Sequence, residues 1–202
     1  MTTRTPESLR LFAALELPSA WAGRLAEVIA SLKASLPGGG VRWVRSEGIH
    51  LTLKFYGDVA PGTVPALQSA LARAAASVPP ISLEMEGLGV FPNLSRPRVI
   101  WADVAGDVER LTALQKAVEQ ASAPLGFKPE GRGFAPHLTL GRVNGTLRPA
   151  ERQILGVVLE RTHIGRPGAF TAEALSLMRS ELRPGGSVYT RLFAASLGGR
   201  NN

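Results

Sequence analysis

The chain contains 202 residues, of which 45% are hydrophobic and 19% are charged, and it has no cysteine. This length can bury a substantial core in one domain or two small lobes, and the composition is typical of an ordered globular protein. Without cysteine, disulfides, thiol nucleophiles and thiolate metal sites are excluded. The N-terminal residues lack the apolar run of a signal peptide, and no segment approaches the roughly 18 apolar residues of a membrane span. We therefore expect a cytoplasmic protein without a membrane partner.

The formal net charge of +7 favours an anionic partner such as nucleic acid. The basic residues are spread along the chain and are mostly arginines, which is also the bias of a GC-rich coding sequence. The charge therefore favours a phosphate ligand but does not identify it.

Hydrophobic periodicity and turn residues predict a succession of strands and helices. Ser19 is expected to be the N-cap of the first helix, and Pro65 lies in the first turn of the second. In chain order, the predicted elements are strand 8–17, helix 19–35, strands 41–44 and 49–56, helix 63–77, strands 81–90 and 98–104, helix 107–121, strand 134–142, helix 149–160, and strands 170–178 and 187–197.

One phrase, His-Leu-Thr-Leu, occurs twice in the chain, at 50–53 and at 137–140. The two copies lie 87 residues apart and contain two of the three histidines of the protein. The same offset places strands 8–17 and 81–90 onto 95–104 and 168–177, and helices 19–35 and 63–77 onto 106–122 and 150–164, where matching elements are predicted. The sequence therefore predicts a single domain, 1–202, made of two duplicated lobes.

Side chains alternate between the two faces of a strand, so His and Thr share one face of each tetrad and the leucines share the other. Imidazoles at His50 and His137 can act as a neutral base and a protonated acid near neutral pH. The hydroxyls of Thr52 and Thr139 lie on the same faces, where they can donate to non-bridging phosphate oxygens. A pair of satisfied core histidines and two ordinary strand threonines is the structural alternative.

The residues after the tetrads differ between the copies, and two of them are candidate phosphate-binding cations. By parity Lys54 is expected on the histidine face and Arg142 on the leucine face, unless Gly141 introduces a bulge that turns Arg142 toward the histidines. For both cations, a solvated charge at the rim is the alternative.

The remaining histidine and aromatic residues are assigned structural roles. His163 is expected at the surface after a helix end, whereas Trp43, Trp101 and Phe91 are expected in the core. Trp43 and Phe134 also flank the tetrads closely enough to stack on a base. Two histidines without a third ligand do not make a zinc site, so no metal or other cofactor is expected.

Two His-x-Thr-x motifs in a duplicated frame of this length resemble the 2H phosphoesterase superfamily. Within it the chain is similar to the bacterial and archaeal RNA 2′,3′-cyclic phosphodiesterases, historically called 2′-5′ RNA ligases. The segments that carry the resemblance are 10–18, 50–57, 87–92, 96–101, 136–142 and 180–189.

The resemblance implies a bilobal α+β fold, with two pseudo-twofold-related lobes of antiparallel-rich sheet, outer helices and a central cleft. It implies metal-independent hydrolysis of RNA 2′,3′-cyclic phosphate ends to 2′-phosphomonoesters. Carried onto this sequence, His137 is the proton acceptor that activates water and His50 is the proton donor to the departing 3′ oxygen. Thr52 and Thr139 bind the non-bridging oxygens. Without the resemblance, the residues support two cooperating histidines but do not assign acid and base.

Other functions are compatible with the same residues. The substrate can be a small cyclic nucleotide instead of RNA, and the reverse reaction would join RNA ends through a 2′-5′ linkage. A non-catalytic RNA-binding module is the alternative from another class, but binding alone does not need imidazoles in the same register twice. The expected partner is RNA with a 2′,3′-cyclic phosphate end or a small cyclic nucleotide, bound by a monomer.

Overall fold

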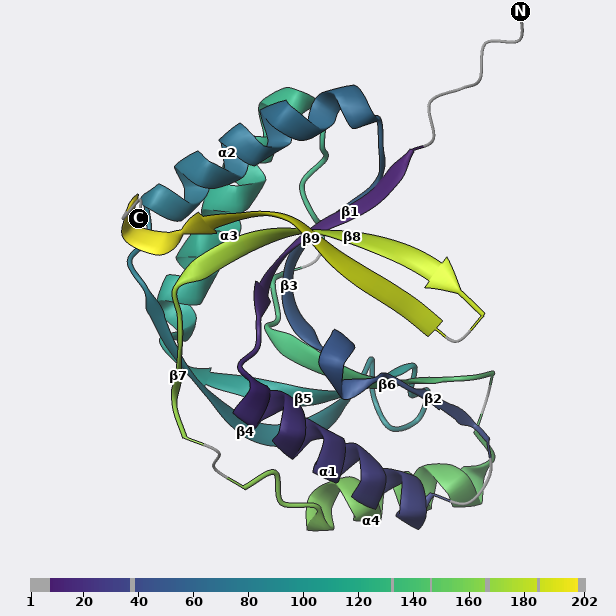
Figure 1. Ribbon diagram of the computed structural model, residues 1–202. Helices are drawn as coiled ribbons and strands as arrows, with labels where there is room; N and C mark the ends of the chain where they lie inside the picture. Colours follow the sequence, from purple (N-terminus) through teal and green to yellow (C-terminus); the bar gives the residue numbers. More distant parts are fainter. Residues whose placement is uncertain are drawn as a thin grey trace, which may run out of the picture.

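Two antiparallel sheets form the protein, and each takes strands from both halves of the sequence (Figure 1). The computed structural model describes residues 8–36, 39–131, 133–145, 147–165, 168–184 and 186–199. The first sheet has the order β3-β1-β8-β9, with β1 Leu9–Glu16, β3 His50–Val59, β8 Ala174–Arg183 and β9 Gly186–Ser196. The second sheet has the order β2-β6-β5-β4-β7, with β2 Val41–Trp43, β4 Ile81–Phe91, β5 Val99–Gly106, β6 His137–Val143 and β7 Phe170–Ala172.

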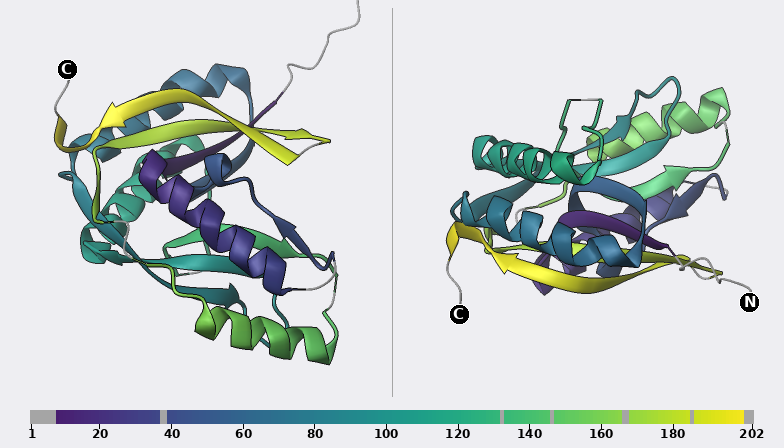
Figure 2. Two further views of the ribbon diagram at one scale, coloured as in Figure 1. Left: turned by 60° about the horizontal axis from the view of Figure 1, so that its bottom comes forward. Right: turned by 90° about the horizontal axis from the view of Figure 1, so that it is seen from above.

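Within the described residues, four α-helices cover the outer sides of the two sheets (Figure 2). In α1 and α3 the buried residues recur at helical spacing, as in Leu25, Val28 and Leu32 of α1. Helices α2 and α3 pack together beside the first sheet, whereas α1 and α4 lie together beside the second. Their bounds are α1 Ser19–Ser35, α2 Val64–Ala76, α3 Val108–Ser122 and α4 Pro149–Arg161, and the 3-10 turns are η1 Ser46–Gly48, η2 Pro61–Thr63, η3 Ala123–Leu125 and η4 Leu197–Gly199.

Helix α1 begins one residue earlier than a Ser19 cap would require. Pro18 occupies the N-cap position, and its carbonyl accepts hydrogen bonds from the amides of Trp21 and Ala22 at 3.0 and 3.1 Å. No side chain caps this end. The prediction of Ser19 as N-cap is therefore wrong, whereas Pro65 lies in the first turn of α2 as predicted.

The predicted strand 170–178 is also wrong, because this segment contains two strands that belong to different sheets. β7 pairs with β4, and after Glu173 the chain enters β8, which pairs with β1. The predicted last strand, 187–197, is β9, and it pairs with β8.

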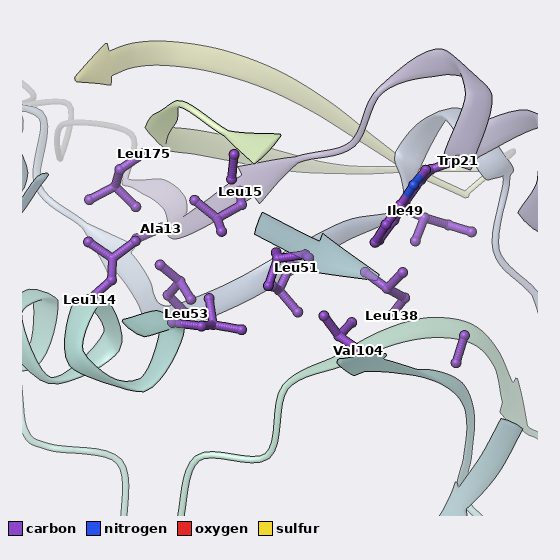
Figure 3. Packing of buried hydrophobic residues seen from close by; sticks show 14 of the residues in the cluster. Ala13, Leu15, Trp21, Ile49, Leu51, Leu53, Val104, Leu114, Leu138 and Leu175 are labelled. Carbon is purple, nitrogen blue, oxygen red and sulfur yellow. The ribbon is translucent and has the colours of Figure 1, made fainter. Parts of the chain in front are cut away.

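A single core joins the two sheets. Strands β3 and β6 contact each other, and the leucines of both tetrads belong to one cluster of buried residues. Figure 3 shows Leu51 and Leu138 in this cluster together with Val104. The α+β fold with two antiparallel sheets agrees with the sequence prediction. In the described part of the chain, no helix is long and apolar enough to cross a membrane.

An offset of 87 residues relates the strand orders of the two sheets. β1 and β3 of the first sheet fall on β5 and β6 of the second, and β4 falls on the segment of β7 and β8. β2 has no counterpart, because β3 is an edge strand in its own sheet whereas β2 covers the corresponding edge of β6. The duplication of the lobes stays our proposal.

Candidate active site

The two tetrads begin β3 and β6 with the alternation that the sequence predicts. Leu51 and Leu138 are fully buried, whereas the histidines and threonines are half-buried on the opposite face. We call the side of each sheet that carries the histidine and threonine of its tetrad the His face.

A β-bulge follows the first tetrad and reverses the alternation. Thr52 pairs with Ala14 and Lys54 with Ala13, so Leu53 is an extra residue in β3. The bulge turns Lys54 away from the His face and places Phe55 on that face instead.

Lys54 is consequently buried on the helix side of the first sheet, with 5% of its surface exposed. Its ammonium forms an ion pair with Glu119 of α3 and donates a hydrogen bond to the Lys128 carbonyl at 2.8 Å. The expectation that Lys54 lies on the His face is therefore wrong. The parity count failed because it assumed an unbroken strand.

The second tetrad has the same bulge at the equivalent position. Thr139 pairs with Trp101 and Gly141 with Ile100, so Leu140 is the extra residue in β6. The prediction that a bulge turns Arg142 toward the His face is confirmed. A side chain at Gly141 would meet β2, because its Cβ would lie 2.8 Å from Val41 Cγ1 and 3.0 Å from Trp43 Cε3.

Both histidines have the same backbone hydrogen bond. Nδ1 of His50 donates to the Gly48 carbonyl at 2.9 Å, and Nδ1 of His137 donates to the Ala135 carbonyl at 2.8 Å. Because a carbonyl only accepts, this bond fixes the proton on Nδ1 and leaves Nε2 for a ligand.

Aromatic rings surround His50. Phe12 stacks on the imidazole with the ring centroids 4.4 Å apart, and Tyr189 approaches edge-on at 4.9 Å. Burial lowers the pKa of His50 from 6.5 to about 4, against smaller raising effects of the Gly48 carbonyl and the Glu16 carboxylate. Free His50 is therefore neutral at pH 7.

His137 also has aromatic neighbours, on strands of the second sheet. The ring of Phe91 meets the imidazole edge-on at a centroid distance of 5.1 Å and stacks on Trp101 at 4.8 Å. Trp101 lies across from Thr139 in the neighbouring strand. Phe91 and Trp101 thus lie on the His face and outside the main core cluster, so their assignment to the core is wrong.

The other aromatic and histidine predictions agree with the structure. Trp43 and Phe134 pack against the main core, and His163 is exposed after the end of α4. Its carbonyl accepts a hydrogen bond from Arg24 Nη2 at 3.0 Å. Among the described residues, no group of three or more His, Asp or Glu side chains is placed to hold a metal ion.

Several residues around the histidines were missed by sequence reasoning. They are Phe12 and Tyr189 at His50, and the carbonyls of Gly48 and Ala135. Phe12 lies in a strand with apolar residues on both faces, so alternation did not show which face it occupies. The carbonyls each precede a histidine by two residues, a shared spacing that could have been noticed.

Comparison with known proteins identifies relatives of this chain. The model of the LigT-like phosphoesterases matches it twice, over residues 15–101 and 104–189. A protein of Methanothermobacter thermautotrophicus named RNA 2′,3′-cyclic phosphodiesterase is 32% identical over 182 residues, which cover 90% of this chain and 95% of the relative.

Solved structures show the same fold. TT0787 of Thermus thermophilus is 27% identical with a TM-score of 0.75, covering 96% of this chain and 100% of that one. The LigT of E. coli complexed with 3′-AMP is 25% identical with a TM-score of 0.71, covering 95% and 99%. With both halves of its sequence matched by one family model and its fold shared over nearly its whole length, the chain belongs to the LigT-like phosphoesterases.

Proposed function

We propose that this protein hydrolyses 2′,3′-cyclic phosphate ends of RNA to 2′-phosphomonoesters by acid–base catalysis with two histidines and without a metal. Membership of the LigT-like phosphoesterases supports the reaction class. The name of the M. thermautotrophicus relative supports the RNA substrate. The net charge of +7 suits a phosphate-rich ligand.

The observation that carries the proposal is that the two imidazoles have equivalent hydrogen bonds and aromatic contacts. Each donates Nδ1–H to a carbonyl two residues earlier, and each is held beside aromatic rings on the face opposite the core. A purely structural histidine gains nothing from having its second nitrogen left for a ligand. Two such nitrogens provide one proton acceptor and one proton donor for a single reaction.

In the proposed reaction His137 Nε2 removes a proton from water while the water oxygen forms a bond to phosphorus. The bond from phosphorus to the 3′ oxygen breaks, and His50 Nε2 supplies a proton to that oxygen. The phosphate remains on the 2′ oxygen. Thr52 and Thr139 donate to the non-bridging oxygens, where negative charge gathers in the transition state. Arg142, on the same face as His137, contributes a cation for phosphate.

The lowered pKa of His50 bears on the assignment of acid and base. With a pKa of about 4, His50 is unprotonated in the free protein at pH 7, and a donor role requires it to take up a proton as the substrate binds. A bound phosphate favours this uptake, because an anion nearby raises the pKa of an imidazole. The opposite assignment has His50 as base and His137 as acid. It requires His50 to be neutral in the free protein, which is the form that burial favours.

The activity itself is tested with a short RNA ending in a 2′,3′-cyclic phosphate, incubated with the protein in excess EDTA. Conversion to the 2′-phosphate is expected, with most activity lost in His50→Ala and in His137→Ala, whereas His163→Ala is the matched control. Normal turnover by His50→Ala would refute the mechanism. Turnover of a cyclic mononucleotide alone would make that the substrate, and RNA affinity that survives loss of both histidines without turnover would indicate a binding module.

A substrate with sulfur in place of the 3′ oxygen assigns the two roles. A thiolate leaves without protonation, so the variant that lacks the acid regains activity on this substrate and the variant that lacks the base does not. Recovery in His50→Ala is expected. Recovery in His137→Ala instead would reverse the assignment. Adding an RNA with a free 5′-hydroxyl end tests the reverse, 2′-5′ joining direction in the same assay.

The proposal also includes the oligomeric state of the protein and its location in the cell. We propose a monomer that acts in the cytoplasm on RNA ends. Light scattering of the purified protein would test the monomer, and microscopy of a tagged protein would test the location.

A further inference from the structure

An acidic residue lies directly across from each tetrad histidine. In the first sheet Glu16 of β1 pairs with His50 of β3, and in the second sheet Asp103 of β5 pairs with His137 of β6. Directly paired residues of antiparallel strands share a face, with their Cβ atoms about 5 Å apart. Both acidic side chains therefore lie on the His face. The offset of 87 residues that relates the tetrads also relates these two acidic residues.

The Glu16 carboxylate is held from the side of the sheet opposite to His50. Ser176 of β8 is buried and donates its hydroxyl hydrogen to Glu16 Oε1 at 2.5 Å. Nη1 of Arg191, on β9, forms an ion pair with the same oxygen at 3.2 Å. In the strand order β3-β1-β8-β9, the carboxylate thus lies between the imidazole and a cation.

Asp103 has a different partner in the second sheet. Its Oδ1 accepts a hydrogen bond from the backbone amide of Val104 at 2.9 Å. Over the ranges that the structure describes, no cation forms an ion pair with Asp103. The acidic residue is therefore common to both sheets, whereas the bound arginine belongs to the first sheet alone. Recurrence beside both histidines points to a role in the reaction, because the two carboxylates have different structural partners.

The charges around His50 act in opposite directions. Three elements pack against its ring, namely β1, β9 and η1. Their titratable and charged groups are Glu16 of β1, Tyr189 and Arg191 of β9, and the exposed Glu47 of η1. Burial lowers the pKa of His50, whereas the bond to the Gly48 carbonyl and the charge of Glu16 raise it. Arg191 shares the Glu16 carboxylate and so weakens its attraction for an imidazolium.

We propose that Glu16 stabilises the protonated form of His50 during the reaction, and that Arg191 limits this effect by binding the same carboxylate. Glu16 is a positioning residue, because it acts through the imidazole and not on the phosphate. It offsets the effect of burial and so helps His50 to hold the proton that goes to the departing 3′ oxygen. The inference rests on the proposed function, in which His50 is the proton donor.

NMR titration of the imidazole signals tests both charges without turnover. Arg191→Gln frees the carboxylate and should raise the pKa of His50, whereas Glu16→Gln should lower it. In the double variant the rise should be lost, because Arg191 acts through Glu16. Glu109→Gln, which removes an exposed carboxylate from α3, is the control and should leave the titration unchanged. An unchanged His50 titration in Arg191→Gln, or an equal rise in the single and double variants, would overturn the proposal.

Kinetics connect the carboxylate to the protonation step. Glu16→Gln should lower kcat on the RNA cyclic phosphate about tenfold at pH 7, because a decrease of one unit in pKa lowers the protonated fraction of an imidazole about tenfold. On the substrate with sulfur in place of the 3′ oxygen, whose leaving group needs no proton, this variant should match the wild type. Glu16→Asp keeps the charge and should retain most of the activity on both substrates.

Two kinetic outcomes would contradict a role of Glu16 in protonation. An equal loss on both substrates in Glu16→Gln would mean that Glu16 only supports the fold, and full activity on the RNA substrate would remove it from the reaction. Absence of turnover by the wild type would count against the proposed function instead. The NMR titration would still decide whether Glu16 stabilises the protonated form of His50.

Discussion

Phe12 and His50 stack with their ring planes 26° apart, and this contact covers one face of the imidazole. Because burial is the main cause of the low pKa of His50, a smaller side chain at position 12 should admit water and raise it. We predict that Phe12→Ala raises the pKa of His50 from about 4 toward 6.5. Titration of the imidazole signals by NMR measures this change.

Tyr189→Ala removes the second aromatic ring that contacts this imidazole and should shift the His50 pKa in the same direction. It is a useful second variant, because Tyr189 is half-buried whereas Phe12 belongs fully to the interior. Phe91→Ala, which removes the aromatic neighbour of His137, is the matched control and should leave the His50 titration unchanged. An unaltered His50 pKa in both variants at position 12 and position 189 would contradict the prediction.

The pKa of His50 also predicts how the free energy of unfolding depends on pH. The unfolded chain takes up a proton at His50 below pH 6.5, whereas the folded protein does so only near pH 4, so protonation favours the unfolded state in between. The contribution of His50 to the free energy of unfolding is therefore fully present above pH 6.5 and is lost as the pH decreases toward 4. The full loss is about 3 kcal/mol, because each tenfold change in proton affinity corresponds to about 1.4 kcal/mol.

Urea unfolding of the wild type and of His50→Asn at pH 7 and pH 4.5 checks this contribution. The variant lacks the titrating group. Between pH 7 and pH 4.5, the wild type should therefore lose most of about 3 kcal/mol in free energy of unfolding relative to His50→Asn. His163→Asn provides the control for removal of an exposed histidine. An equal difference between wild type and His50→Asn at both pH values would rule the contribution out.

Lys54 is predicted to stabilise the fold and to have no role in binding substrate. Lys54→Met leaves Glu119 without its cation in a mostly buried place, which should cost about 3 kcal/mol in the free energy of unfolding. The double variant Lys54→Met, Glu119→Gln should regain part of this loss, because no unpaired charge is left. KM for the cyclic phosphate should be that of wild type in every variant that folds.

Urea unfolding and steady-state kinetics on the same preparations separate the two roles. Lys33→Met, at an exposed lysine of α1, is the control and should change the free energy of unfolding by no more than about 0.5 kcal/mol. A rise in KM without a loss of stability in Lys54→Met would restore it as a substrate ligand.

The fate of Lys54 and Arg142 shows how far the sequence predicts the site. Alternation correctly separates His and Thr from the leucines over four residues, because the bulge comes only at the last leucine of each tetrad. Directly after that point the faces are reversed, as Lys54, Phe55 and Arg142 show. Nothing in Leu53 distinguishes a bulge from a regular strand, whereas Gly141 gave a visible signal in the second copy.

The fold was predictable to a similar extent. Periodicity placed the four helices and most strands to within a few residues, because each buries one regular face. The local pattern of 170–178 predicts one strand, because it does not show that the chain changes sheets at Glu173. Sheet membership depends on pairing between distant strands, and such pairing leaves little trace in a local pattern.

Thr52 and Thr139 are predicted to act in the transition state through their hydroxyl groups. Threonine and valine are both β-branched strand formers, so Thr52→Val and Thr139→Val should remove one donor each and preserve the strand. Loss of one donor to the developing charge should lower kcat by about 100-fold, with a smaller change in KM. Steady-state kinetics on the RNA cyclic phosphate measures both constants.

Thr171→Val, at an exposed threonine of β7, is the matched control and should keep the wild-type kcat. The double variant separates two ways in which the threonines can act. If each hydroxyl binds its own non-bridging oxygen, the two losses in kcat should multiply, because independent contacts are additive in free energy. A double variant no slower than either single one would mean that the hydroxyls serve one shared contact, and a wild-type kcat in both single variants would remove the threonines from the mechanism and leave them as strand residues.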